Sequence, residues 1–404
     1  MRRAAPDPPL ASEPSPPSAG LGRTALWGGF VVTGAATVLL GPLIPALRPT
    51  WGVDAATSAV LFPALFIATS VGAVVSSWNL RLSLIGGYLA IAIGLGAVGV
   101  VPWPLPVVAL VAVGLGVGLI NPATNLLVAH DPASVGTDGQ RGATLARLNL
   151  VWGIGAVSCP LLFAAARESV PILAVLAVPA VAAVVVALGL WTDRTIGDFS
   201  EPETVDEEAS SGWQRHLLLL PIALIFCFYV GIETSVGGWL VELADQIGGV
   251  GVVSMLIGSG YWAALLLGRA LMPAMLRHVS EPGLFVAGLV IALVGVTLLW
   301  TADSRTAAAL GGALAGFGLS PVFPLTVSLL AEQTATTGAR GTGWVFSLTG
   351  VGGAAMPWLT ARMPGAADSL RAGFIVPWLS VLVLVALLAI QRRVTQGEVE
   401  RIGP

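Results

Sequence analysis

Stretches of about 20 mostly apolar residues recur almost without a break along this chain of 404 residues. A helix needs about that length to cross the hydrocarbon layer of a membrane. A transmembrane barrel would instead show segments of about ten residues with alternating polarity, and the sequence has no such alternation. The composition, 55% hydrophobic and 10% charged, also favours apolar surfaces that face lipid. We therefore expect an all-α membrane protein with about twelve transmembrane helices, at 24–47, 55–77, 82–101, 105–130, 143–166, 170–191, 216–242, 247–273, 281–301, 306–331, 341–362 and 369–391.

Polar stretches divide the chain into two parts of similar length. Residues 1–20 form a proline-rich polar run that we expect to be a disordered tail, and they lack the early apolar core and small-residue cleavage site of a signal peptide. The acidic stretch 193–214 falls almost midway and indicates a solvated cytoplasmic linker. The predicted domains are thus two six-helix bundles, 21–192 and 215–392, followed by a cytoplasmic tail at 393–404.

Basic residues indicate how the chain is oriented, because loops rich in Lys and Arg stay in the cytoplasm. With both termini placed inside, fourteen of the 19 basic residues, all of them arginines, fall on the cytoplasmic side. This distribution favours an even number of spans and a multi-pass protein of the cell inner membrane with both termini in the cytoplasm. The net charge of −3 argues against a nucleic-acid partner.

Reactive side chains are few and scattered. Cys159 and Cys227 each lie singly inside a predicted helix, so neither a disulfide framework nor a metal-ligand spacing is available. His130, His216 and His278 lie at cytoplasmic ends of separate segments, whereas an enzyme would need clustered nucleophiles, bases or ligands. A channel would need rings of polar groups or carbonyls, which two asymmetric halves do not supply. We expect no enzymatic activity, no metal and no cofactor apart from a proton or sodium gradient.

The two halves repeat one another. The segment GLGVGLINPATNLLVAH at 114–130 aligns with GFGLSPVFPLTVSLLAE at 316–332, with glycines, a proline and a threonine in register. The segment 34–43 aligns in the same way with 231–240, and glycines of the predicted fifth helix align with those of the eleventh. Internal repeats are characteristic of transporter folds, in which the solute binds near the membrane midplane between halves that rock against each other.

Four segments resemble the major facilitator superfamily, and within it the fucose-permease-like branch of sugar carriers. FYVGIETSVGGWL at 228–240 is similar to the seventh helix of that branch, GLGVGLINPATN at 114–125 to its fourth, and RLNLVWGIGA at 147–156 to its fifth. GRALMPAMLRH at 268–278 is similar to the cytoplasmic turn after the eighth helix. The resemblance covers nearly the whole chain and implies a secondary transporter of the major facilitator fold.

Two departures from the family pattern bear on the coupling mechanism. The turn SSWNLRLSLIGG at 76–87 keeps Arg81 but lacks the acid that the superfamily usually has there. The resemblance would also imply acids in the first and fourth helices for proton symport, yet 24–47 has none and the matching position of the fourth helix falls near Leu119. The proton pathway of the family therefore cannot be transferred to this chain.

Glu233 is the acid that lies well inside a predicted helix, about 13 Å from the outer end and about 25 Å from the inner end of 216–242. A charge at such a depth costs at least about 2.5–3.5 kcal/mol. One interpretation is a proton or cation site whose occupancy is linked to solute binding. The other is a structural carboxyl that is hydrogen-bonded to a neighbouring helix.

Four arginines are candidates for a cytoplasmic gate: Arg81, Arg147, Arg269 and Arg277. Arg269 lies near the cytoplasmic end of 247–273, so we expect it about a dozen ångströms or more from Glu233 along the membrane normal. A gate contact is the expected role of Arg81 and Arg277. For Arg269 and Arg147 we expect a gate contact or a cap on a helix end, with solute binding as the alternative.

Polar and aromatic side chains of the predicted cavity are candidates for solute binding: Asn121, Asn125, Asn149, Trp152, Glu233, Trp239 and Trp262. The resemblance implies that the fourth and fifth helices line the cavity, and Asn149 and Trp152 share a helix face. The tryptophans could stack on the apolar face of a sugar ring. The alternatives are hydrogen bonds between helices for the amides, and packing or the interfacial belt for the tryptophans.

The expected function is secondary transport of a small polar solute, with a sugar as one class, by alternating access and ion coupling through Glu233. The alternative is proton-driven efflux of an amphipathic compound or drug. The expected partners are the solute and the lipid bilayer, and the protein is expected to be a monomer.

The topology can be tested with single cysteines at Ser18 and Thr395 in a variant that lacks Cys159 and Cys227. We expect a membrane-impermeant thiol reagent to label neither site in intact cells and both sites in inverted vesicles, because both termini should be cytoplasmic. Labelling of one terminus from each side would contradict an even number of spans.

Overall fold

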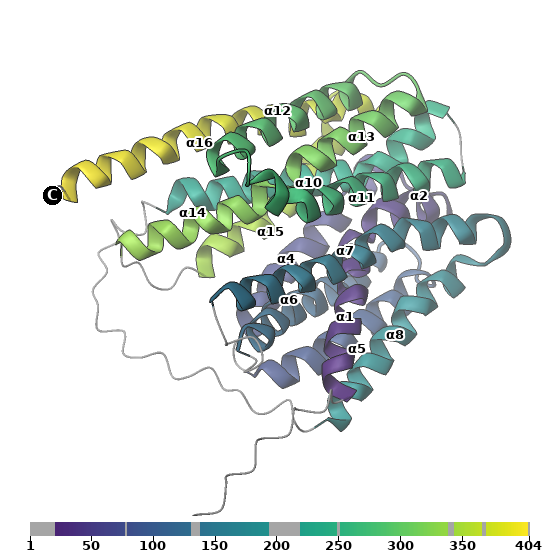
Figure 1. Ribbon diagram of the computed structural model, residues 1–404. Coiled ribbons are helices and arrows are strands. Elements are labelled where there is room, and N and C mark those ends of the chain that lie inside the picture. The colour runs from purple at the N-terminus through teal and green to yellow at the C-terminus, as the bar shows by residue number, and fades with distance from the viewer. Residues whose placement is uncertain are drawn as a thin grey trace, which may run out of the picture.

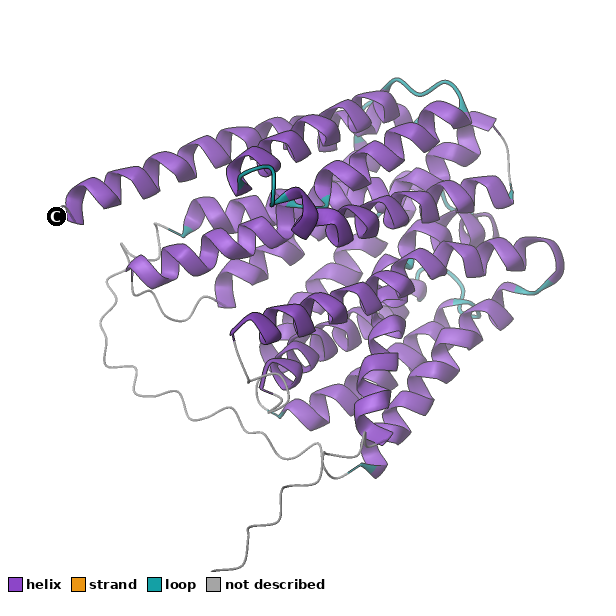
Figure 2. Cartoon of the chain, in the orientation of Figure 1, coloured by secondary structure: helices purple, strands orange, loops and turns teal. Residues whose placement is uncertain are grey.

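The computed structural model describes residues 21–76, 79–130, 138–193, 219–248, 251–337, 343–365 and 369–402, and the regular structure within them is helical (Figure 2). The predicted tail 1–20 and the predicted linker 193–214, apart from Asp193, lie outside these residues. The helices of the first half are α1 (Leu21–Val38), α2 (Leu40–Trp51), α3 (Ala55–Ser58), α4 (Leu61–Val75), α5 (Leu80–Val98), α6 (Pro106–His130), α7 (Asp138–Ser169) and α8 (Ile172–Thr192).

The helices of the second half follow the same plan. They are α10 (Leu220–Gly248), α11 (Val252–Met275), α12 (Glu281–Trp300), α13 (Arg305–Leu319), α14 (Val322–Thr337), α15 (Gly343–Arg362), the 3₁₀ helix η3 (Leu370–Phe374) and α16 (Ile375–Ile402). Figure 1 shows the two halves as two layers of roughly aligned helices. Within the first half α1 packs on α7 and α8, and within the second half α10 packs on α15 and α16.

Each of the twelve predicted segments is helical over most of its described residues, with short breaks between α3 and α4 in the second and between α13 and α14 in the tenth. Within the described residues, ten helical segments are long and apolar enough to cross a membrane, and the bent pair α1 and α2 makes eleven. The chain is thus a multi-pass membrane protein. The remaining predicted segment, 341–362, corresponds to α15, whose glycines and polar residues lower its hydropathy.

Several helices run past their predicted ends. The sequence predicts a span that ends at 242, but α10 continues to Gly248, and α16 continues to Ile402 through most of the predicted tail 393–404. The sequence prediction ends a span where the residues stop being apolar, and that point marks where contact with lipid ends. A helix can continue beyond that boundary because its hydrogen bonds are satisfied internally.

The first span is broken between α1 and α2, which meet at an angle of 53°. Pro42 has no N–H with which to bond the carbonyl of Val38, and its ring clashes with that carbonyl. The helical ladder resumes at Leu43, whose N–H donates to the Leu39 carbonyl at 3.0 Å. The bend lies where the sequence predicts one continuous helix, 24–47.

The sequence repeat corresponds to a repeated packing of glycines against neighbouring backbones. A Cβ at Gly114 would collide with the Leu65 carbonyl of α4. A Cβ at its repeat partner, Gly316, would collide with the Tyr261 carbonyl of α11. Equivalent glycines thus hold equivalent helices together in the two halves, which confirms the predicted pairing of the fourth and tenth spans.

The most extensive contacts between the halves join α2 with α10, α4 with α15, and α7 with α11. A Cβ at Gly41 would meet the Gly237 carbonyl, so α2 and α10 approach each other backbone to backbone. Between α11 and α7, the Ser259 hydroxyl donates to the Val157 carbonyl at 3.0 Å. These two contacts lie toward the end of the bundle that includes the C-terminal part of α10.

Close glycine packing can be tested by adding single methyl groups. A Cβ at Gly155 would overlap the Val31 carbonyl of α1, and a Cβ at Gly352 would overlap the Cys227 carbonyl of α10. We expect Gly155→Ala and Gly352→Ala each to lower the melting temperature of the detergent-solubilised protein by several degrees, because two backbones must separate. Gly96→Ala is the matched control, since nothing lies within 4 Å of a Cβ there. Equal stability of all three variants would contradict the packing.

Candidate functional site

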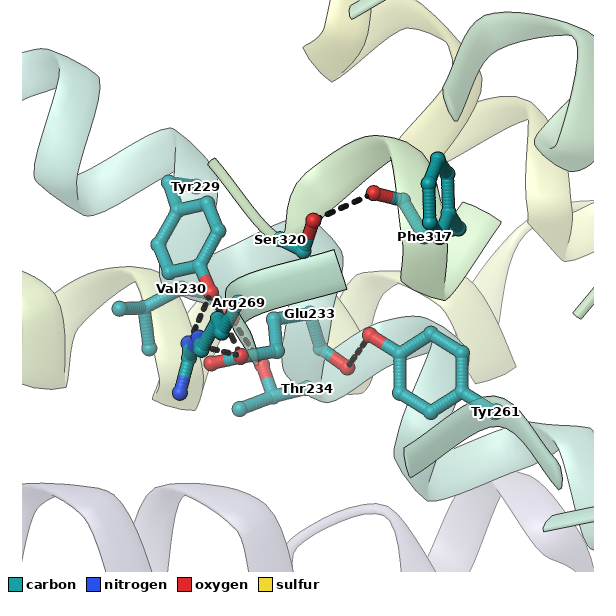
Figure 3. Close-up of polar contacts among 8 residues, drawn as sticks. All are labelled: Tyr229, Val230, Glu233, Thr234, Tyr261, Arg269, Phe317 and Ser320. Carbon is teal, nitrogen blue, oxygen red and sulfur yellow. Dashed lines mark hydrogen bonds and ion pairs between the residues drawn. The ribbon is translucent and has the colours of Figure 1, made fainter. Parts of the chain in front are cut away.

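Two polar side chains of α10 lie one helical turn apart and contact each other. The hydroxyl of Tyr229 donates a hydrogen bond to Oε1 of Glu233 at 2.6 Å (Figure 3). Residues at i and i+4 share a helix face, which brings the two side chains together. The backbone carbonyl of Glu233 accepts a hydrogen bond from the Tyr261 hydroxyl of α11 at 3.1 Å. Glu233 is thus held at both its side chain and its backbone.

Arg269 of α11 completes the cluster. Its Nη2 donates to the Tyr229 hydroxyl at 2.9 Å and lies 3.4 Å from Oε1 of Glu233, forming an ion pair. The guanidinium also lies 6.0 Å from the ring centroid of Phe323 in α14. The side chains of Glu233 and Arg269 are 12% and 17% exposed. Two opposite charges therefore neutralise each other among largely buried groups.

This contact corrects the predicted separation of Arg269 from Glu233. Along their helices, Glu233 lies about 20 Å from Leu220 and Arg269 about 9 Å from Met275. Side chains tilt toward the N-terminus of their own helix. Because α10 and α11 are antiparallel neighbours, the two tilts bring the long side chains toward each other. The prediction compared backbone depths and omitted the direction of the side chains.

An aromatic group joins the two halves near this cluster. The ring centroids of Trp152 in α7 and Trp262 in α11 lie 6.2 Å apart, edge to face. Trp262 also packs edge-on against Tyr261, with 4.9 Å between centroids. Tyr261 in turn bonds the backbone of Glu233, so these aromatic rings are mechanically connected to the ion pair.

Trp239 is fully buried. Its indole N–H donates to the carbonyl of Pro357 in α15 at 2.8 Å, and its ring lies 5.2 Å from that of Phe62 in α4. In this conformation Trp239 is a packing residue between elements of both halves. Its predicted contact with solute stays a prediction for another conformation.

The three asparagines differ in their surroundings. The amide of Asn125 donates to the backbone carbonyl of Asn121 at 2.8 Å, one turn earlier in α6. The side-chain oxygen of Asn121 is buried and has no hydrogen-bond partner among the described residues. Asn149 is exposed at the surface of α7. The roles predicted for these amides in solute binding stay predictions.

The predicted gate arginines do not lie together. Arg81 donates to the carbonyl of Trp191 at 3.0 Å, which caps the C-terminal end of α8. Arg147 and Arg277 are exposed, and Arg269 belongs to the cluster with Glu233. A gating role for these residues stays a prediction.

Sequence reasoning missed a second ion pair, which joins the halves. Nη2 of Arg48 in α2 lies 2.5 Å from Oε1 of Glu242 in α10. The Glu242 side chain is 2% exposed, and Gln246 also donates to it at 3.3 Å. The sequence places Glu242 at the end of a predicted span and Arg48 in an outer loop. The signal that could have revealed the pair is the apolar Leu243 and Ala244, which continue the helix beyond Glu242.

Among the residues that the structure describes, no three His, Cys, Asp or Glu side chains come together in a way that could hold a metal ion. Two ion pairs are described above, one within the second half and one between the halves.

No protein-family profile matches the sequence, and no curated protein matches it. Solved structures do match. The peptide transporter POT in complex with sulfate has a TM-score of 0.69 at 15% identity, over 93% of this chain and 94% of that chain. The major facilitator superfamily transporter FucP in its outward conformation has a TM-score of 0.61 at 16% identity, over 91% and 98% of the two chains. This chain has the major facilitator fold. A D-xylose-proton symporter has 0.66 at 13% identity, over 89% and 96%.

The ion pair between the halves predicts a measurable effect on opening. We expect Glu242→Gln to increase the labelling rate of Ser259→Cys, in a variant without Cys159 and Cys227, by about tenfold, which corresponds to about 1.4 kcal/mol. Loss of the Glu242 charge leaves Arg48 unpaired, and separation of the halves would expose position 259, which now contacts Val157.

The reagent for this experiment is membrane-impermeant and is added from the side of Arg48. Glu281→Gln is the control, because Glu281 is an exposed acid at the start of α12. An unchanged labelling rate in Glu242→Gln would show that the pair does not hold the halves together.

Proposed function

We propose that this protein is a secondary active transporter that moves a small polar solute across a membrane by alternating access. The observation that carries the proposal is the neutralised cluster of Tyr229, Glu233 and Arg269 within the membrane-spanning part of a major facilitator fold. Charged groups within a membrane are costly and are usually linked to an ion or substrate pathway. The solved structures of this fold include a D-xylose-proton symporter, which supports ion-coupled transport of a sugar-like solute.

The alternating motion would separate the halves at one end and bring them together at the other. At the end of the bundle where Arg48 lies, three kinds of contact hold the halves together. They are the backbone approach of Gly41 to Gly237, the hydrogen bond from Ser259 to Val157, and the ion pair of Arg48 with Glu242. These contacts are polar or backbone in nature, so they can break and form again in contact with water. The distribution of arginines in the sequence supports placing this end on the outer side of the cell inner membrane, with both termini in the cytoplasm.

Ion coupling would operate at Glu233. A proton from the water on one side binds the carboxylate, and the neutral acid no longer compensates the charge of Arg269. The site would then favour a conformation or a bound solute that compensates the charge of Arg269. The proton would leave on the other side of the membrane. Trp152 and Trp262 stand at the contact between halves, where their rings could stack on the solute as the cavity forms.

The proposal predicts the effect of Glu233→Gln on transport in proteoliposomes reconstituted with the purified protein. We expect the variant to lose accumulation of a labelled solute, glucose or its anionic analogue glucuronate, driven by an imposed proton or sodium gradient, because an amide cannot exchange a proton. It should still exchange labelled for unlabelled solute when the solute concentration is equal on the two sides of the membrane, since exchange needs no net movement of ions. Glu281→Gln is the matched control, with the same substitution at an exposed acid.

Gradient-driven uptake that is unchanged in Glu233→Gln would remove this residue from the coupling step. The same preparation tests the alternative direction of transport. Binding of hydrophobic cations without competition from sugars would favour efflux of an amphipathic compound over uptake of a polar solute.

A further inference from the structure

Arg269 uses only part of its capacity to donate hydrogen bonds. A guanidinium carries five N–H donors in a planar fork. Among the residues that the structure describes, Nη2 makes the two polar contacts of this side chain, to Tyr229 and to Glu233. Nε is buried without a hydrogen-bond partner in that part of the chain. Figure 3 shows the other terminal nitrogen turned away from the Glu233 carboxylate. A strong set of donors is therefore left for a further acceptor.

The two described ion pairs differ in a way that indicates different roles. Arg48 and Glu242 lie 2.5 Å apart, whereas Arg269 and Glu233 lie 3.4 Å apart and share one nitrogen and one oxygen. Strong Arg-carboxylate pairs are shorter, at about 2.7–2.9 Å, and are frequently bidentate. The longer, single contact of Arg269 is suited to an exchange of partners.

Tyr229 can hold Arg269 during such an exchange. Its hydroxyl accepts a hydrogen bond from Arg269 and donates one to Glu233. A protonated Glu233 would still accept the bond from Tyr229 through its carbonyl oxygen, but it would no longer attract the guanidinium as a charge. Arg269 would then remain positioned by Tyr229 while its charge became available to another anion.

We propose that the solute carries an anionic group, a carboxylate being the simplest, which binds Arg269 in place of Glu233 while Glu233 takes up one proton. This inference rests on the proposed transport function. In the exchange, a proton from the adjoining water forms an O–H bond with the Glu233 carboxylate, the ionic contact of Glu233 with Arg269 breaks, and the solute anion forms a new one. The net charge of the site is zero before and after. One anion and one proton therefore cross the membrane together without moving net charge.

The surroundings of Glu233 are consistent with this exchange. The titratable or charged groups that face it are Tyr229 on its own helix and Tyr261 and Arg269 on α11, while α14 adds the apolar ring of Phe323. Arg269 is thus the cation of the cluster. A neutral sugar could accept hydrogen bonds from Arg269 but would leave its charge uncompensated once Glu233 is protonated, whereas an anionic solute compensates that charge.

A first experiment measures anion binding directly, with acetate as the probe and the full chain in detergent. Glu233→Gln imitates the protonated acid and leaves Arg269 without its counter-charge. We expect the melting temperature of this variant to rise by several degrees in sodium acetate relative to sodium chloride of equal ionic strength. Acetamide, the neutral analogue, should have no effect.

The matched control is the double variant Glu233→Gln, Arg269→Gln, which removes both charges and keeps the site neutral. It should not respond to acetate. If Glu233→Gln shows no acetate response, or if the double variant responds equally, the assignment of Arg269 as the anion site is overturned.

A second experiment separates this inference from the transport function, using labelled glucuronate and glucose, which share a six-carbon frame and differ in the carboxylate. In wild-type proteoliposomes we expect an inward proton gradient to drive uptake of glucuronate over glucose, and an imposed membrane potential to leave the uptake rate unchanged. Gradient-driven uptake of glucose that glucuronate does not inhibit would overturn the anionic solute and leave the transporter function intact.

Discussion

Helices within lipid gain no hydrophobic free energy by associating, because lipid tails are as apolar as the helix surfaces. The fold of this protein therefore depends on how closely its backbones can approach. Glycines supply that approach where spans cross, as Gly155 does on α1 and Gly352 does on α10. The same contact recurs in both halves, so the internal repeat of the sequence is a repeat of packing sites.

Close backbone approach also occurs between the two halves. Gly41 meets the Gly237 backbone, and a side-chain hydrogen bond and an ion pair lie in the same interface. Each half is packed internally by long helix pairs, whereas the contacts between the halves are concentrated in α2 with α10, α4 with α15 and α7 with α11, and they include aromatic rings. A bundle built in this way can move as two rigid bodies, which is the mechanical requirement of alternating access.

Much of the architecture could be predicted from the sequence because lipid imposes a length on apolar segments. The positions of twelve helical segments and the pairing of Gly114 with Gly316 were both available in this way. Helix ends could not be predicted as well, since α10 continues past the apolar boundary to Gly248. That error concealed the ion pair of Glu242 with Arg48.

The candidate site was predictable in part. Glu233 was apparent as a carboxyl deep in an apolar helix, but its partners were not. The contact with Arg269 depends on the tilt of two side chains on antiparallel helices, and the bridging role of Tyr229 depends on the helix face it shares with Glu233. These are properties of three-dimensional arrangement that a comparison of residue depths does not contain.

The break at Pro42 has a mechanical consequence for the first span. It divides the span into two segments that pack against different parts of the protein. The helix α1 packs on α7 and α8 in its own half, whereas α2 packs against α10 in the other. Since proline has already removed the hydrogen bond at the joint, movement of α2 away from α10 need not break a helical bond there. The span can thus bend at Pro42, so that α1 stays fixed in its own half while α2 leaves the opposite half.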